Sequence, residues 1–146
     1  MSRKLRIFLG DPRYFTEGTS FPLGIGFLAA TIRERFGSDI DVRCFIEPQK
    51  LLDSIRQQPP DILGLANYTW NRALNAALIR LSKAASPRTL TVMGGPAFSR
   101  DDKPWLERFF RRNESLDFYV AGAGEFAFEE IVRLALAEPN KAIEHV

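Results

Sequence analysis

The sequence contains very little cysteine and histidine, with one residue of each among 146. Because Cys44 has no partner for an intramolecular disulfide, a disulfide-stapled secreted fold is excluded and a reducing cytoplasm is favoured. A single thiol also cannot hold an iron–sulfur cluster, which needs about three or four thiolates. Since His145 is the only histidine, a site built from several histidine ligands is excluded, and catalysis by a buried imidazole is disfavoured.

Long apolar runs and a large excess of one charge are missing as well. The net charge is only +2, and Arg108, Arg111 and Arg112 form the nearest approach to a basic cluster. Acidic residues interleave with this cluster, a pattern typical of a solvated helix face: Asp101, Asp102, Glu107 and Glu114. After the basic N-terminus the apolar stretch covers only residues 7–9, too short for a signal peptide or a membrane span. The sequence therefore predicts a soluble cytoplasmic protein that binds neither nucleic acid nor membrane.

Short apolar runs alternate with amphipathic stretches along the chain. We predict strands at residues 5–9, 42–46, 62–66, 89–93 and 118–121. We predict helices from Pro22 to Gly37, around 51–55, and over 71–85, 103–112 and 126–137. The first helix is expected to gather Leu23, Phe27, Leu28 and Ile32 on one face, and the third to turn Leu74, Leu78 and Leu81 inward.

Five strand–helix repeats predict the fold class. Alternating β and α elements form a parallel sheet covered on both faces. We therefore expect an α/β, Rossmann-like (flavodoxin-like), doubly wound five-stranded parallel sheet with helices on both faces, occupying residues 1–138. In such sheets, ligands bind beyond the carboxyl ends of the strands, where the strand order reverses.

Unusual residues follow four of the five predicted strands, and these are the candidate cofactor-binding residues. They are Phe21, Pro22, Leu23, Gly24 and Gly26 after the first strand; Asn67, Tyr68, Thr69, Trp70 and Asn71 after the third; Gly94, Gly95 and Pro96 after the fourth; and Gly122, Gly124 and Glu125 after the fifth. No catalytic residue and no protein metal ligand is expected.

The glycines among these residues indicate close approach by a ligand or by another part of the chain. Gly24 and Gly26 each cost a helix about 1 kcal/mol relative to alanine, so either a ligand or tight helix–sheet packing must compensate. Gly94 and Gly95 let backbone meet a ligand directly, although an ordinary turn also explains them. Glu125 is explained equally by helix capping.

The segment at residues 67–71 places polar groups between two aromatic side chains. This composition suits a flat ligand with hydrogen-bonding edges. The alternative is that Asn71 caps the following helix while Tyr68 and Trp70 only pack against the protein.

Other nucleotide- and phosphate-binding patterns fit the chain less well. Gly24, Gly26 and Ala29 match a dinucleotide fingerprint, but that fingerprint needs its first glycine directly after the first strand. A receiver domain needs an aspartate where Asn67 stands, as well as a lysine after the fifth strand. The loop at residues 16–20 is a loose version of a flavodoxin phosphate loop, so a flavin- or nucleotide-binding module remains an alternative. A third alternative is a ligand-free interaction domain.

Taken together, five segments resemble the N-terminal cobalamin-binding domain of cobalamin-dependent radical S-adenosylmethionine enzymes. They lie at residues 22–30, 60–64, 67–71, 94–96 and 122–125. The resemblance implies that the corrin ring lies over the strand ends, with residues 67–71 facing its lower side. By the same resemblance, residues 94–96 and the helix from Leu23 flank the buried nucleotide tail of the cofactor, and residues 122–125 line the far side of its pocket.

The chain departs from the wider cobalamin-binding group at one chemically important point. Methionine-synthase-like members ligate cobalt through a D-x-H-x-x-G motif after the first strand, whereas residues 11–24 contain no histidine. The resemblance therefore implies cobalamin with its own base detached and no protein imidazole on cobalt.

The chain also lacks the cysteine motif of the radical domain. We expect it to bind and present cobalamin rather than to catalyse. S-adenosylmethionine and the 4Fe–4S cluster would be bound by a separate radical S-adenosylmethionine domain, with residues 139–146 beginning the linker to it and methyl transfer as the joint reaction.

Overall fold

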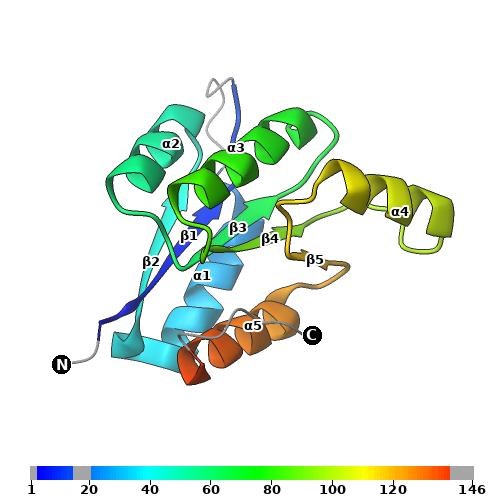
Figure 1. The fold of residues 1–146 in the computed structure, drawn as a ribbon. Helices are drawn as coiled ribbons and strands as arrows, with labels where there is room; N and C mark the ends of the chain where they lie inside the picture. Colours follow the sequence, from blue (N-terminus) through cyan, green and yellow to red (C-terminus); the bar gives the residue numbers. More distant parts are fainter. Residues whose placement is uncertain (1–2, 15–20, 139–146) are drawn as a thin grey trace.

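Five parallel strands form one sheet in the computed structural model, which describes residues 3–14 and 21–138 (Figure 1). The strands are β1 (Leu5–Gly10), β2 (Ile40–Phe45), β3 (Ile62–Ala66), β4 (Leu90–Gly94) and β5 (Phe118–Val120). Their spatial order is β2-β1-β3-β4-β5, and every neighbouring pair is parallel. The order reverses between β1 and β3, so a crevice is expected beyond the carboxyl ends of these two strands.

Helices cover both faces of the sheet. They are α1 (Leu23–Phe36), α2 (Pro48–Gln57), α3 (Arg72–Ala85), α4 (Lys103–Arg112) and α5 (Glu125–Ala137), with a short 3₁₀ turn at Gly37–Asp39 after α1. One hydrophobic core joins α1 and α5 to the sheet, and a second core joins α2, α3 and α4 to the opposite face. Figure 1 shows the same two layers, with α1 and α5 below the strands and α2 and α3 above them. The predicted fold class is thus confirmed.

Side-chain burial in two helices differs from the sequence prediction. α1 buries Ile25, Ala29 and Ile32, whereas Leu23 and Phe27 remain 68% and 60% exposed. α3 buries Asn75, Leu78, Ile79 and Ser82, and leaves Leu81 exposed. Both helices carry apolar residues on more than one side, so the spacing of those residues could not decide which face meets the sheet.

No helix in residues 3–14 and 21–138 has the length and hydropathy of a membrane-spanning segment.

Candidate functional site

Two buried asparagines shape the loop between β3 and α3. The backbone N–H of Asn67 donates to Gly94 O at 2.6 Å, and its side-chain Nδ2 reaches Ala97 O at 3.4 Å. Asn71 accepts from the Tyr68 backbone N–H at 2.8 Å and donates to Ala66 O at 2.9 Å. Asn67 and Asn71 therefore close the loop onto the ends of β3 and β4 and do not project toward solvent. This places both of them in the scaffold of the predicted site.

The same loop presents a flat aromatic surface. The rings of Tyr68 and Trp70 stack with centroids 4.5 Å apart and planes 5° apart, and Trp70 is 65% exposed. Thr69 between them is exposed as well. We call the stacked Tyr68–Trp70 pair the aromatic platform. The two rings pack on each other, and most of the Trp70 side chain remains exposed as a flat apolar surface.

Asn75 is a component of the site that the sequence analysis missed. It is completely buried, and its Nδ2 lies 3.0 Å from Ala66 O, 3.2 Å from Asn71 Oδ1 and 3.4 Å from Asn67 Oδ1. Its own Oδ1 is buried without a hydrogen-bond partner. The sequence spacing could have identified Asn75, because Asn67, Asn71 and Asn75 follow one another at intervals of four residues. The three form a buried amide ladder that fixes the position of the aromatic platform.

The Gly94–Gly95–Pro96 turn packs directly against this ladder. Gly95 has φ +130°, and a Cβ there would lie 2.6 Å from the carbonyl oxygen of Asn67. Tyr119 donates its hydroxyl hydrogen to Gly95 O at 2.7 Å. Gly95 is therefore required by the neighbouring loop of the protein itself, which is one of the alternatives left open by the sequence. Pro96 is exposed at the tip of the turn.

Burial raises the pKa of the Tyr119 phenol, while its hydrogen bond with Asn67 and the nearby charge of Arg72 act in the opposite direction. Tyr119 also stacks on Phe98 with centroids 3.8 Å apart. The phenol is consequently held neutral behind the turn, as a donor to Gly95.

The N-terminus of α1 offers a second apolar surface. Phe21, Leu23 and Phe27 are exposed large apolar residues, which we call the apolar shelf. The ring of Phe21 lies 2.5 Å from where a Cβ of Gly26 would stand, so Gly26 makes room for this ring. Gly24, in contrast, has no atom of the described residues within 4 Å of its Cβ position. Of the two helix glycines, Gly24 is therefore the one that the packing of the described residues does not require.

The first turn of α1 has no side-chain cap among the described residues. Pro22 is buried at the N-cap and its side chain accepts no hydrogen bond, and the turn contains no acidic residue. Backbone N–H groups in the first turn of a helix can donate to a polar or anionic group.

The loop before α5 lies next to α1. Gly122 has φ +81° and open space at its Cβ position, whereas a Cβ at Gly124 would lie 3.9 Å from Leu28 Cδ2. Glu125 occupies the first turn of α5, and Phe126 is 85% exposed. Gly122 thus joins Gly24 as an open position, while Gly124 is used in packing.

A buried carboxylate lies directly after β1. Asp11 is almost fully buried and its Oδ2 accepts from Arg13 Nη2 at 2.8 Å, while its Oδ1 has no hydrogen-bond partner among the described residues. This hydrogen bond raises the pKa of the Arg13 guanidinium. Asn71 Nδ2 reaches Pro12 O at 3.4 Å, which ties this loop to the amide ladder across the β1–β3 crevice. Residues 15–20, which include the suggested phosphate loop, lie outside the described residues.

The sequence model of the B12 binding domain matches residues 16–132. The chain belongs to the B12-binding domain family. This confirms the resemblance drawn from the strand-end segments, and it agrees with a surface in which the aromatic platform and Gly24 lie at the carboxyl ends of parallel strands.

Two methyltransferases are similar in sequence to this B12-binding domain. It is 36% identical over 99 residues to a 2-(S-pantetheinyl)-carbapenam-3-carboxylate methyltransferase from Streptantibioticus cattleyicolor, covering 64% of this chain and 14% of that protein. It is 33% identical over 90 residues to the cobalamin-dependent radical SAM methyltransferase TokK from Streptomyces tokunonensis, covering 62% of this chain and 12% of that protein. The chain therefore spans only a small part of the length of these curated relatives.

Solved structures share the fold at low sequence identity. A cobalamin-binding protein from Desulfitobacterium hafniense superimposes with a TM-score of 0.62 at 17% identity, over 88% of this chain and 57% of that chain. The response regulator domain of Thermotoga maritima CheB gives 0.56 at 10% identity, over 93% and 96% of the two chains. These likenesses support the five-stranded parallel architecture alone.

Proposed function

We propose that this domain binds cobalamin with its own base detached and no protein imidazole on cobalt, and presents it to a radical S-adenosylmethionine domain. The observation that carries the proposal is the exposed aromatic platform, held by a buried amide ladder at the β1–β3 crevice. A flat ligand of corrin size needs such a surface, and its amide side chains need donors and acceptors at the rim.

The described residues fit cobalamin at several independent points. The aromatic platform supplies a flat apolar surface, and Gly24 and Gly122 supply open backbone positions where no side chain obstructs a ligand. The first turn of α1 adds backbone N–H groups that have no side-chain cap in residues 3–14 and 21–138. The chain has no histidine before His145, so the strand-end loops contain no imidazole for cobalt.

In this proposal the residues of the chain bind and orient the cofactor. Tyr68 and Trp70 face the lower side of the corrin and exclude water from it, while Asn67, Asn71 and Asn75 hold the two rings in place. The apolar shelf and the open glycines receive the nucleotide tail. When bound in this form, cobalamin supplies the ability to accept and donate a methyl group at cobalt; the protein supplies placement and electrostatics.

The relatives support the second half of the proposal. TokK is by its name a cobalamin-dependent radical SAM methyltransferase, and this chain corresponds to a small part of such a protein. We infer that methyl transfer is the reaction served and that the catalytic domain is a separate part in cis or in trans. S-adenosylmethionine and the 4Fe–4S cluster belong to that part.

The test is to mix the purified protein with hydroxocobalamin, desalt it, and record the visible spectrum at acid and neutral pH. We expect retained corrin with the spectrum of the base-detached form at both pH values. Electron paramagnetic resonance of the reduced Co(II) state should show no splitting from an axial nitrogen. A nitrogen-split signal would contradict the ligation state, and loss of corrin from folded protein would contradict binding.

A further inference from the structure

A pocket of about 300 Å³ lies between the start of α3 and the inner side of α4. It is lined by Arg72, Trp105, Arg108, Phe109, Arg112 and Asn113. None of these residues belongs to the proposed cobalamin surface. The volume is at the lower end of the range for small-molecule sites, which favours a small ligand over a protein segment.

Three arginines line this pocket, and none of them is paired with a carboxylate among the described residues. Other arginines of the described chain form ion pairs, such as Arg35 with Glu129 and Arg133 with Glu130. Among residues 3–14 and 21–138, no ion pair joins Arg72, Arg108 or Arg112 to an acidic side chain. The pocket therefore holds a concentration of positive charge that the described protein does not neutralise.

Two weak local repulsions act on these exposed arginines. Arg108 and Arg112 are four residues apart on α4, where like charges repel along a helix. Arg72 is the first residue of α3, where the helix dipole already contributes positive charge, and that turn contains no acidic residue. A bound oxyanion would relieve both repulsions.

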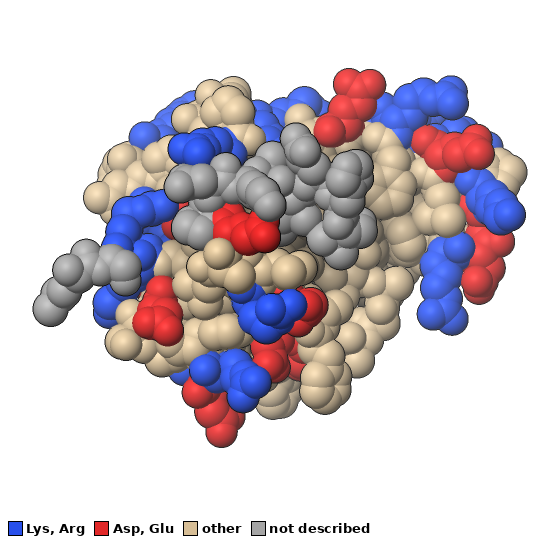
Figure 2. Space-filling model, turned by 60° about the horizontal axis from the view of Figure 1, so that its bottom comes forward, with Lys and Arg blue, Asp and Glu red and all other residues tan. Residues whose placement is uncertain are grey.

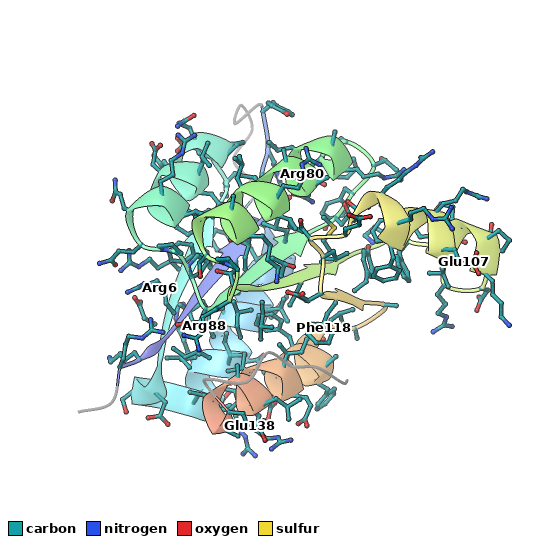
Figure 3. All side chains as sticks on the ribbon, in the orientation of Figure 1. Arg6, Arg80, Arg88, Glu107, Phe118 and Glu138 are labelled. Atoms are coloured by element: carbon teal, nitrogen blue, oxygen red, sulfur yellow. The ribbon has the colours of Figure 1, made fainter. Side chains whose placement is uncertain are left out.

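Arg108, Arg111 and Arg112 are all exposed, as expected of a solvated helix face, but only Arg108 and Arg112 line the pocket. At about 100° per residue, Glu107 lies roughly 160° around α4 from Trp105, and Arg111 lies about 120° from it. Glu107 is labelled on α4 in Figure 3, and Figure 2 shows Lys or Arg and Asp or Glu side chains gathered together over this helix. Arg111 does not line the pocket, so it serves as a matched control for Arg112.

Aromatic rings complete the pocket. Trp105 and Phe109 stack with centroids 4.9 Å apart and planes 12° apart, and Phe109 is buried beneath. A planar guanidinium recognises a carboxylate or phosphate with two parallel hydrogen bonds, while the rings offer a flat apolar contact. This combination selects an anion attached to a flat group.

We propose that the pocket between α3 and α4 is a second binding site, which takes a small molecule carrying a carboxylate or phosphate on a flat apolar group. The site goes beyond the cobalamin proposal and does not depend on it. Its ligand contacts Arg72, Arg108 and Arg112 through charge-assisted hydrogen bonds and the Trp105 ring by stacking.

The test uses isothermal titration calorimetry with benzene-1,3,5-tricarboxylate as the probe. We expect saturable binding by the parent protein, weakened about tenfold by Arg108→Gln and by Arg112→Gln, since each loses a charge-assisted contact. The control Arg111→Gln removes the same charge from α4 and should change the affinity less than twofold. Arg80→Gln, farther along α3 (Figure 3), is the corresponding control for Arg72→Gln.

Two further ligands test the chemistry of the site. cis-Cyclohexane-1,3,5-tricarboxylate carries the same three charges without the flat ring, and should bind several-fold more weakly. Phenyl phosphate distinguishes a phosphate source from a carboxylate source, and binding of either one with the same arginine dependence supports the site.

Equal weakening by Arg111→Gln and Arg112→Gln would show general charge attraction and overturn the proposal. The proposal would also be overturned if none of these ligands bound saturably. It would be overturned as well if an acidic peptide were the only ligand whose binding depended on the arginines. Arg108→Gln should still retain cobalamin like the parent, so failure here is separate from failure of the proposed function.

Discussion

Substitution of Gly24 is the sharpest test of whether a residue serves the fold or the cofactor. Its Cβ position has no neighbour within 4 Å in the described part of the chain, so the substitution Gly24→Leu adds a side chain at the N-terminus of α1 without displacing any described atom. Because leucine favours a helix over glycine by about 0.8 kcal/mol, the free energy of unfolding should stay constant or rise. In a domain of this size that corresponds to a Tm increase of about 2 °C.

Cobalamin binding by Gly24→Leu should weaken, although its free energy of unfolding does not fall. A leucine side chain at position 24 occupies the space assigned to the nucleotide tail, and we expect Gly24→Leu to lose the corrin on desalting. Glu34→Leu is a matched control on the same helix. Glu34 is exposed and lies about 15 Å farther along α1, so this variant should retain cobalamin like the parent.

Gly95→Ala is the contrasting variant. Its Cβ would stand 2.6 Å from Asn67 O at φ +130°, which combines backbone strain with overpacking and costs about 3 kcal/mol. The Tm should fall by about 9 °C, measured by circular dichroism. Loss of cobalamin from Gly95→Ala therefore reports on the fold, whereas loss from Gly24→Leu reports on the site. Full retention by Gly24→Leu, or its unfolding, would refute the reasoning.

Further outcomes follow from the aromatic platform, the amide ladder and the buried phenol. Trp70→Ala should weaken cobalamin binding about tenfold in a titration while the Tm stays unchanged, because the ring is largely exposed; a large fall in Tm would show that the ring belongs to the core. Asn75→Ala removes a fully buried donor and should cost about 2 kcal/mol, or about 6 °C in Tm; an unchanged Tm would contradict the ladder. Because burial raises the folded-state pKa of Tyr119, folding holds its proton more tightly, and the free energy of unfolding should fall as pH rises above about 10. Tyr119→Phe should show a smaller alkaline loss in urea titrations, and an equal loss would mean that other groups cause it.

The sequence alone predicted the alternation of strands and helices and the strand ends at which to search for a ligand. Continuous apolar runs such as residues 62–66 are typical of strands buried on both faces, and glycine, proline and asparagine predict the turns after them. The segments after those strands also carried the resemblance to the B12-binding family. These features are local, so a local pattern was sufficient to find them.

Within the candidate site, residues of similar appearance turned out to have different roles. Asn67 and Asn71 were expected to face a ligand, but they hold the loop from inside, together with Asn75, which was not anticipated. Gly24 and Gly26 stand two residues apart, yet only Gly24 has open space. An asparagine or a glycine looks the same in the sequence whether it contacts a ligand or a distant part of the backbone.

The sequence by itself determined which segments form strands and helices, since that depends on the periodicity of neighbouring residues. Only the tertiary structure decided the strand order β2-β1-β3-β4-β5, the side of α1 that faces the sheet, and the meeting of Arg72 with Arg108 and Arg112. Leu23 and Phe27 illustrate the physical reason. α1 has apolar residues on several sides, so contacts with the sheet and with α5, formed by residues far away in sequence, select which of them are buried.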